Sequence, residues 1–289
     1  MSETESLMTA GPAPIPGDAH GRGMREHAQP RGSLREAWGH RELLFFLAWR
    51  DVKVRYKQTA LGVLWAVIQP LFTMVLFTVL FGRFAKLSSD GVPRPIFYFS
   101  ALLPWTYLSN TVSAASMSLV SNSNLLTKIY FPRFMLPAAV VLSGLMDFLI
   151  GSALLVGFIL YYHVGVGWSL LLWPLLVAQM ALLGLTIGLF LSAVNVQYRD
   201  VKYAIPFVVQ LWMFITPVIY PVSMIPKAYR PLLAINPAAG LIEAFRHAIV
   251  PSSPVQWNLL GISTVTTILG FVGALAFFKR TESAFADII

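Results

Sequence analysis

The chain has 289 residues, of which 56% are hydrophobic and only 12% are charged, and its mean hydropathy is +0.67. Soluble domains carry roughly 25% charged residues, so this composition excludes an ordinary water-soluble protein and indicates a polytopic membrane protein. The net charge is +8, but the basic residues lie between apolar runs, so we expect them to contact lipid head groups and not nucleic acid.

The N-terminal part of the chain predicts a tail followed by a helix that does not cross the membrane. Residues 1–32 are rich in Gly and Pro and predict a disordered cytoplasmic tail. In the next segment, 33–58, Ser33 and Glu36 have the spacing of a capping box. On a helix, its apolar and charged side chains would form two separate faces. The apolar run is too short to span a bilayer, so we expect an amphipathic helix in the membrane interface. A soluble helix packed on a partner is the alternative.

The stretch WRDVKVRYKQTALGVLWAVIQP, residues 49–70, changes abruptly from basic to uncharged. Positive charge at the end of an apolar span marks its cytoplasmic side. The basic belt therefore predicts that the first span begins at the cytoplasmic surface. The residues of the belt are Arg50, Lys53, Arg55 and Lys57.

The rest of the chain, 59–289, predicts an all-α transmembrane domain with six spans. Each apolar run approaches or exceeds the roughly 20 residues that a helix needs to cross a bilayer. The expected spans are 61–82, 95–119, 134–162, 169–195, 203–220 and 255–278. Most of the 21 Lys and Arg residues then fall on the side of the two termini, so both termini are expected in the cytoplasm.

Two connections between spans have unusual sequences. The inner segment SNSNLLTKIYFPRFMLP, 121–137, predicts a short amphipathic helix that either docks into a partner or rests on lipid head groups. The segment 216–250 is apolar but contains five prolines, so neither half can span a bilayer. We expect a re-entrant pair of short gate helices there, near the outer surface, with a plain loop as the alternative.

Polar and small residues inside the spans are few. Asp147 is alone in the middle of the third span, and we expect a structural role for it, packed inward on Ser, Asn or backbone groups, in preference to a transport role. Glu243 and Arg246 have the i,i+3 spacing of a helical ion pair. Gly184 and Gly188 form a GxxxG step that predicts close helix packing.

The motifs of common enzyme classes are missing from the sequence. It contains no GxxxxGK[ST] phosphate loop, no HExxH and no GxSxG, and its lack of cysteine excludes thiolate metal sites. No metal site is expected. If the protein moves a substrate uphill, another chain must supply the energy. Aromatic residues are dense at FYFSALLPWTY, 97–107, where they predict either an interfacial belt or a lining for sugar faces.

From about residue 43 onward, several segments in this order carry a family resemblance. They are LAWRDVKVRYKQTALGVLWAVIQPL, LLPWTYLSNTV, NLLTKIYFPRFMLP, VQYRDVKYAIPFVVQLWMFITPVIYP and INPAAGLIEAFRHAI. Together they resemble the permease subunit of polysaccharide-exporting ABC transporters of the type 2 export family, which moves O-antigen, capsule or teichoic acid chains. The resemblance implies a homodimer in the cytoplasmic (inner) membrane, mounted on a dimer of separate ATP-binding subunits. ATP and Mg²⁺ would bind those partners, with no cofactor in this chain.

The resemblance also implies roles for particular residues. The basic belt, Arg50, Lys53, Arg55 and Lys57, would receive the diphosphate of a lipid-linked glycan. The inner-loop helix would couple to the ATPase through Asn124, Leu125, Leu126, Lys128 and Tyr130. The channel and its gate would be lined by Trp105, Tyr107, Trp212, Phe214 and Met224. The segment 221–251 matches the outer gate helices of the family.

Three other functions compete with polysaccharide export. An ABC exporter permease for a smaller amphipathic substrate, such as a drug or lipid, is the nearest. An integral-membrane glycosyltransferase or polymerase would need catalytic acids or bases in the outer loops, which hold almost none. A secondary transporter would need carboxylates that couple transport to an ion, and inverted repeats, neither of which is visible.

Overall fold

The computed structural model describes residues 39–57, 63–128, 131–198, 200–226, 228–249 and 256–282, and the regular structure in these segments is entirely helical. An all-α fold is therefore confirmed for the described part of the chain. The predicted tail 1–32 and the start of the predicted interface helix lie outside the described residues.

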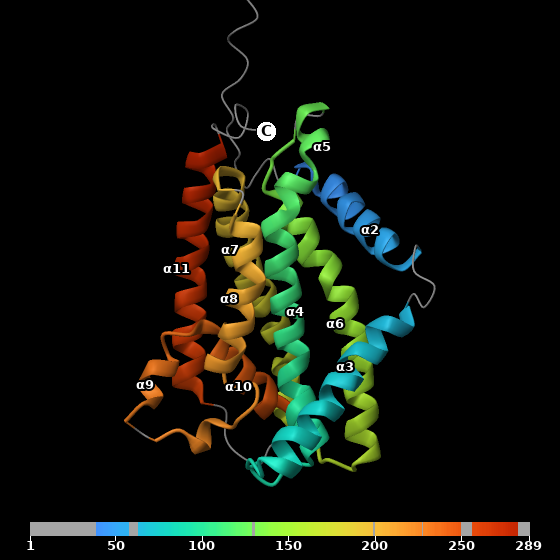
Figure 1. Ribbon diagram of the computed structural model, residues 1–289, viewed down its shortest axis with the longest axis vertical. Coiled ribbons are helices and arrows are strands. Elements are labelled where there is room, and N and C mark those ends of the chain that lie inside the picture. The colour runs from blue at the N-terminus through green and yellow to red at the C-terminus, as the bar shows by residue number, and fades with distance from the viewer. Residues whose placement is uncertain are drawn as a thin grey trace, which may run out of the picture.

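The longer helices run along the molecule and alternate in direction (Figure 1). They are α3 (Val63–Phe77) with its π-helical continuation η1 (Thr78–Phe84), α4 (Arg94–Ser121), α6 (Met135–Tyr161), α7 (Trp173–Gln197), α8 (Val201–Ile215) and α11 (Trp257–Glu282). The shorter helices are α2 (Arg41–Lys57), α5 (Ser123–Lys128), η2 (Trp168–Leu172), η3 (Val222–Met224), α9 (Arg230–Leu233) and α10 (Pro237–Ile249).

Four helical segments in the described residues are long and apolar enough to cross a membrane. They are Leu64–Phe84, Met135–Tyr161, Trp168–Gln197 and Trp257–Glu282. These segments correspond to the first, third, fourth and sixth spans expected from the sequence. The other two expected spans are helices of a different kind, because α4 has 28 residues but many polar ones, and α8 is apolar but has only 15 residues.

Helix α4 lies at the centre of the bundle and packs most extensively against α7 and α6. Small residues permit the close approach of α7. A Cβ atom added to Gly188 would lie 2.6 Å from the Cβ of Ala115, and one added to Gly184 would lie 3.1 Å from Cγ2 of Thr111. The close packing predicted by the GxxxG step is therefore present, and it is made with α4.

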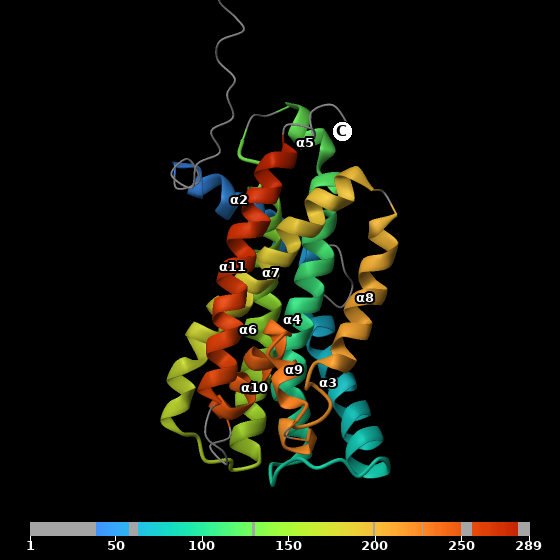
Figure 2. The same cartoon turned by 90° about the vertical axis from the view of Figure 1, so that its left-hand side faces the viewer.

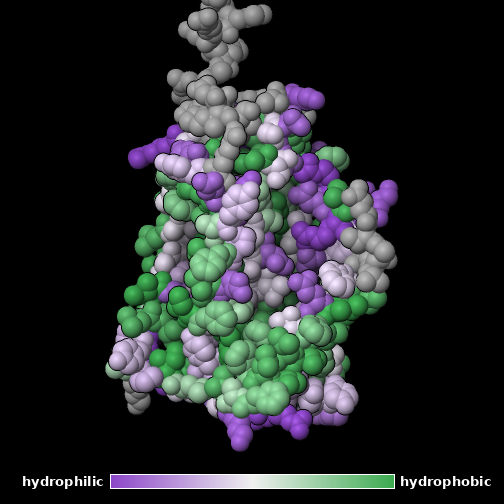
Figure 3. All heavy atoms as spheres, in the orientation of Figure 1, coloured by the Kyte–Doolittle hydropathy of each residue, from purple (hydrophilic) through white to green (hydrophobic). Residues whose placement is uncertain are grey.

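The two ends of the bundle differ. Helix α2, helix α5 and the end of α11 lie at one end, while α9, α10 and the connection between η1 and α4 lie at the other (Figures 1 and 2). Helix α2 packs across α6, burying Leu47 and Ala48 in a cluster with Met135 and Leu136. Hydrophilic residues gather at both ends and beside α2, and hydrophobic residues cover much of the surface between them (Figure 3).

Candidate functional site at the junction of α2, α3, α4 and α6

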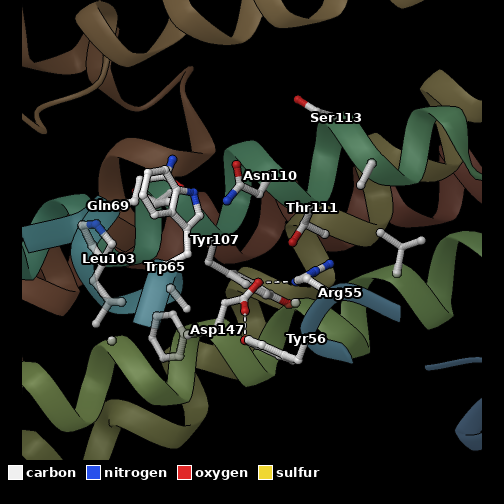
Figure 4. Close-up of a pocket in the computed structure, with 18 residues that line it drawn as sticks. Arg55, Tyr56, Trp65, Gln69, Leu103, Tyr107, Asn110, Thr111, Ser113 and Asp147 are labelled. Carbon is white, nitrogen blue, oxygen red and sulfur yellow. Dashed lines mark hydrogen bonds and ion pairs between the residues drawn. The ribbon is translucent and has the colours of Figure 1, made fainter. Parts of the chain in front are cut away.

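A cavity of about 600 Å³ lies between the last turn of α2 and helices α3, α4 and α6. Its walls are mostly apolar, with a few polar groups that converge on the space (Figure 4). The lining residues are Arg55, Tyr56, Trp65, Ala66, Gln69, Pro70, Leu103, Thr106, Tyr107, Asn110, Thr111, Ser113, Ala114, Val140, Gly144, Asp147, Phe148 and Gly151. The volume falls within the range of about 300–1,000 Å³ that is usual for small-ligand sites.

The carboxylate of Asp147 connects α6 to the end of α2. Nη1 of Arg55 donates a hydrogen bond to one carboxylate oxygen of Asp147, and the hydroxyl of Tyr56 donates to the other (Figure 4). Burial raises the pKa of the Tyr56 hydroxyl, and its bond to Asp147 raises it further, so Tyr56 stays a neutral donor. The partners of Asp147 are therefore Arg55 and Tyr56, and not the Ser, Asn or backbone groups expected from the sequence.

The lining of the cavity also includes uncharged polar groups and an aromatic ring. Gln69 of α3 and Asn110 of α4 supply amides, and Thr106 and Ser113 supply hydroxyls. The indole of Trp65 is 55% exposed and lies one helical turn from Gln69 on α3 (Figure 4). Amides and hydroxyls next to an exposed ring suit a ligand that carries both hydroxyl groups and apolar faces.

The four residues of the basic belt have different surroundings. Arg50 donates to Asp51 at 2.8 Å and to Asn122 at 3.2 Å, so it ties α2 to the end of α4. The ammonium of Lys53 lies 5.7 Å from the ring centroid of Trp49. Lys57 is exposed in the last turn of α2, and Arg55 reaches the cavity. Of these four, only Arg55 lines the cavity.

The five predicted channel residues are not gathered at one place in the single chain. Trp105 and Tyr107 are buried, and the ring of Trp105 meets that of Trp212 edge to face at 5.4 Å. The Tyr107 hydroxyl donates to the carbonyl oxygen of Val141, and the ring lines the cavity. Phe214 and Met224 are about half exposed. Their role in a channel stays a prediction.

The predicted coupling residues lie on α5 at the α2 end of the bundle (Figure 1). Asn124 and Lys128 are exposed, whereas Leu125 and Leu126 pack partly against the cluster beneath α2. Tyr130 lies outside the described residues. The sequence prediction of a short amphipathic helix is confirmed for Ser123–Lys128.

At the opposite end, α10 carries a buried charge cluster. Nη1 of Arg246 donates to Glu243 at 2.8 Å, which confirms the predicted ion pair, and Nε2 of His247 lies 3.1 Å from the other Glu243 oxygen. Arg246 also donates to the carbonyl oxygen of Pro217 at 2.8 Å and stacks on Phe97 at 4.1 Å. Burial alone would raise the pKa of the Glu243 carboxyl, but the bond with His247 and the charge of Arg246 outweigh it and hold that pKa below its usual value.

The described residues contain no group of three or more His, Cys, Asp or Glu side chains that could hold a metal ion. The chemistry of the cavity therefore comes from one cation, one anion, amides, hydroxyls and rings.

Comparison with known proteins identifies the family. Residues 42–250 match the model of the family described as ABC-2 type transporter. The chain belongs to this family. The match extends from α2 to the end of α10, so it includes every residue that lines the cavity. The family expected from the sequence is confirmed.

Relatives of this ABC-2 family member match along nearly their whole length. The O-antigen export system permease protein RfbA of Myxococcus xanthus is 30% identical over 264 residues, which are 89% of this chain and 98% of the relative. An RfbA of Klebsiella pneumoniae is 24% identical over 252 residues, 86% of this chain and 95% of the relative. The polysialic acid transport protein KpsM of Escherichia coli is 25% identical over 246 residues, 81% of this chain and 92% of the relative.

Proposed function

We propose that this chain is the permease subunit of an ABC transporter that exports a polysaccharide of the O-antigen or capsule kind. The observation that carries the proposal is the 30% identity to an O-antigen export permease over 89% of this chain and 98% of that relative. The relatives are named as transport permeases and not as enzymes. We therefore assign ATP hydrolysis, with its ATP and Mg²⁺, to a separate subunit.

In the proposed assembly, α4 and α8 complete a set of six membrane-crossing helices. Helix α4 tolerates polar residues because most of its side chains are buried by neighbouring helices, where lipid does not reach them. A straight α8 of 15 residues extends only about 22 Å, less than the roughly 30 Å of a hydrocarbon core, but the apolar, irregular segment 216–220 follows it directly.

We further propose that two copies of the chain pair through α3 and α8. The segment Leu64–Phe84 is only 11% buried in its most apolar part, so the protomer itself covers little of this span. On α8, Phe207, Leu211 and Phe214 are about half exposed or more. A channel between two such faces would be lined with apolar and aromatic side chains, as expected for a barrier that excludes water at rest.

The proposed orientation puts α2, α5 and the end of α11 on the cytoplasmic side. Basic side chains at this end include the belt on α2 and Lys279 and Arg280 in the last turn of α11. Their positive charge favours the cytoplasmic surface. Helix α5 would then face the ATP-binding subunit, the belt would receive the diphosphate of a lipid-linked glycan, and α9 and α10 would lie near the outer surface as gate helices.

Reconstitution tests the proposal. The chain is co-expressed with a candidate ATP-binding subunit, purified, and placed in proteoliposomes with a lipid-linked glycan. We expect a stable complex whose ATP hydrolysis rises with the glycan and whose vesicles translocate it. A complex stimulated by a drug or a simple lipid, but not by the glycan, would favour the exporter of small amphipathic substrates. Glycan elongation by the chain alone would favour a polymerase.

A further inference from the structure

The cavity contains one cation and one anion that are paired with each other, a pairing that the proposed function does not require. Among the residues that line it, Arg55 and Asp147 are the charged ones, and they neutralise each other. Their side chains remain 40% and 32% exposed, so the pair is open to the cavity and is not sealed in a core. A competing anion in the cavity can therefore reach Arg55 without opening a core.

We propose that the Asp147 carboxylate is a resident counter-anion for Arg55, and that an isoprenyl diphosphate head group displaces it when the cavity is occupied. This inference rests on the proposed function and adds to it a defined site and a competing group. The carboxylate occupies a hydrogen-bonding position on Arg55 that a phosphate oxygen can take, because guanidinium pairs with both anions in the same planar geometry.

The exchange is favourable in charge and space. A diphosphate carries more negative charge than one carboxylate and offers more acceptor oxygens to the guanidinium of Arg55. The displaced carboxylate is 32% exposed and lines the cavity, so it has room to turn away from Arg55 within the cavity. Beyond the anion, the first sugar would lie against Trp65, with the amides of Gln69 and Asn110 within the same cavity.

Displacement would also release a helix contact. Arg55 and Tyr56 belong to the last turn of α2, and Asp147 lies in the middle of α6. While both hydrogen bonds persist, they hold the end of α2 against α6. When a diphosphate takes the place of the carboxylate, this tie is lost and the last turn of α2 is no longer held to Asp147. Asp147 would thereby link the presence of substrate to the position of the interface helix.

Binding of a defined probe tests the inference. The permease with its ATP-binding subunit is placed in neutral phosphatidylcholine nanodiscs, and equilibrium binding of labelled farnesyl diphosphate is measured. Asp147→Asn removes the competing charge and keeps only one acceptor oxygen for Arg55 or Tyr56, so we expect a Kd about fivefold lower. Arg55→Gln should remove most binding, and adding Asp147→Asn to it should restore none.

Two further arms separate the alternatives. Asp200→Asn makes the same chemical change at the cytoplasmic end of α8, away from the cavity lining, and should leave the Kd unchanged. Unlabelled inorganic diphosphate should compete with the probe, whereas competition by farnesol alone would place recognition in the hydrocarbon and overturn the proposal. An unchanged or higher Kd for Asp147→Asn in a stably folded complex would also overturn it.

A second variant protects the test against misfolding. Tyr56→Phe removes one of the two hydrogen bonds to Asp147 and leaves all charges in place. It should lower the Kd by about twofold, in the same direction as Asp147→Asn. Glycan-stimulated ATP hydrolysis of the unmodified complex is measured in parallel. If that stimulation is present and the Kd values do not shift, the counter-anion inference fails alone; if stimulation is absent, the proposed function fails.

Discussion

The carboxylate of Glu243 joins two basic side chains where water does not reach. Glu243 and Arg246 are each 4% exposed, and Arg246 also binds the carbonyl oxygens of Pro217 and Val218 in the chain that follows α8. A buried charge that loses its partner is costly, by about 3–5 kcal/mol, because it remains desolvated. This cluster therefore fixes α10 against the end of α8.

Glu243→Ala should lower the midpoint of thermal unfolding of the detergent-solubilised protein by about 10 °C. Glu42→Ala, at an exposed position on α2, is the control and should change it little. The double variant Glu243→Leu with Arg246→Met should recover part of the loss, because neither charge is left unpaired. Equal melting of Glu243→Ala and the control would contradict the role given to the cluster.

The same carboxylate gives a dependence on pH. The pKa of Glu243 is lower in the folded protein than its ordinary value of 4.5. Its contribution to the free energy of unfolding is therefore fully present above about pH 4.5 and is lost as the pH falls through the lowered folded-state pKa. The sequence predicted the pair by its i,i+3 spacing, but it gave no sign of the contacts with His247, Phe97 or Pro217.

At the scale of helices, the packing of α7 on α4 depends on the absence of side chains. The space beside Gly188 is filled by the Cβ of Ala115, which cannot rotate away. Helix α11 gives a contrast, because a Cβ added to Gly273 would meet no atom within 4 Å. The GxxxG pattern predicted a contact for α7, but only the folded structure identifies α4 as the partner.

Gly188→Ala should destabilise the protein by about 1–2 kcal/mol, since overpacking outweighs the better helix propensity of alanine. Gly273→Ala makes the same change without a clash and should be neutral or slightly stabilising. Thermal unfolding of the two variants in the same detergent compares them directly. A loss of equal size at both positions would show that glycine flexibility, and not the approach of α4, determines the effect.

At the scale of the whole molecule, the two ends of the bundle differ in their short helices and in the placement of their charged side chains. The α2 and α5 end carries exposed basic side chains and a short projecting helix, and the other end carries α9, α10 and the buried charge cluster. This polarity is what a permease needs if one end meets an ATP-binding subunit and the other releases the substrate.

Lys128 and Lys86 test this polarity, because both are exposed lysines at opposite ends of the bundle. Lys128→Glu on α5 should weaken association with the ATP-binding subunit by about fivefold, the size expected from reversing one exposed charge at an interface. Lys86→Glu should leave association unchanged. Affinity is measured by titrating the purified subunit onto nanodiscs. If only Lys86→Glu weakened binding of the ATP-binding subunit, the orientation would be the reverse of the proposed one.

The sequence by itself determined the helical membrane character of this protein, one local ion pair and the family. Hydropathy over some 20 residues predicted the helices, local spacing predicted the Glu243–Arg246 pair, and ordered motifs predicted the family. These features are readable because each depends on residues close together in the chain. Two of the six expected spans are less clear by hydropathy. Helix α4 can be polar because neighbouring helices cover it, and helix α8 is short and is followed by irregular chain.

Only the tertiary structure decided which distant residues meet. Arg55 and Asp147 attracted notice separately in the sequence, one in the basic belt and the other as a lone carboxylate, but 92 positions separate them. Tyr107, expected in a channel, lines a cavity within one protomer, and its role in a channel stays a prediction. Hydropathy records whether a residue prefers water or lipid; it does not record the rotation and crossing of helices, which bring these side chains together.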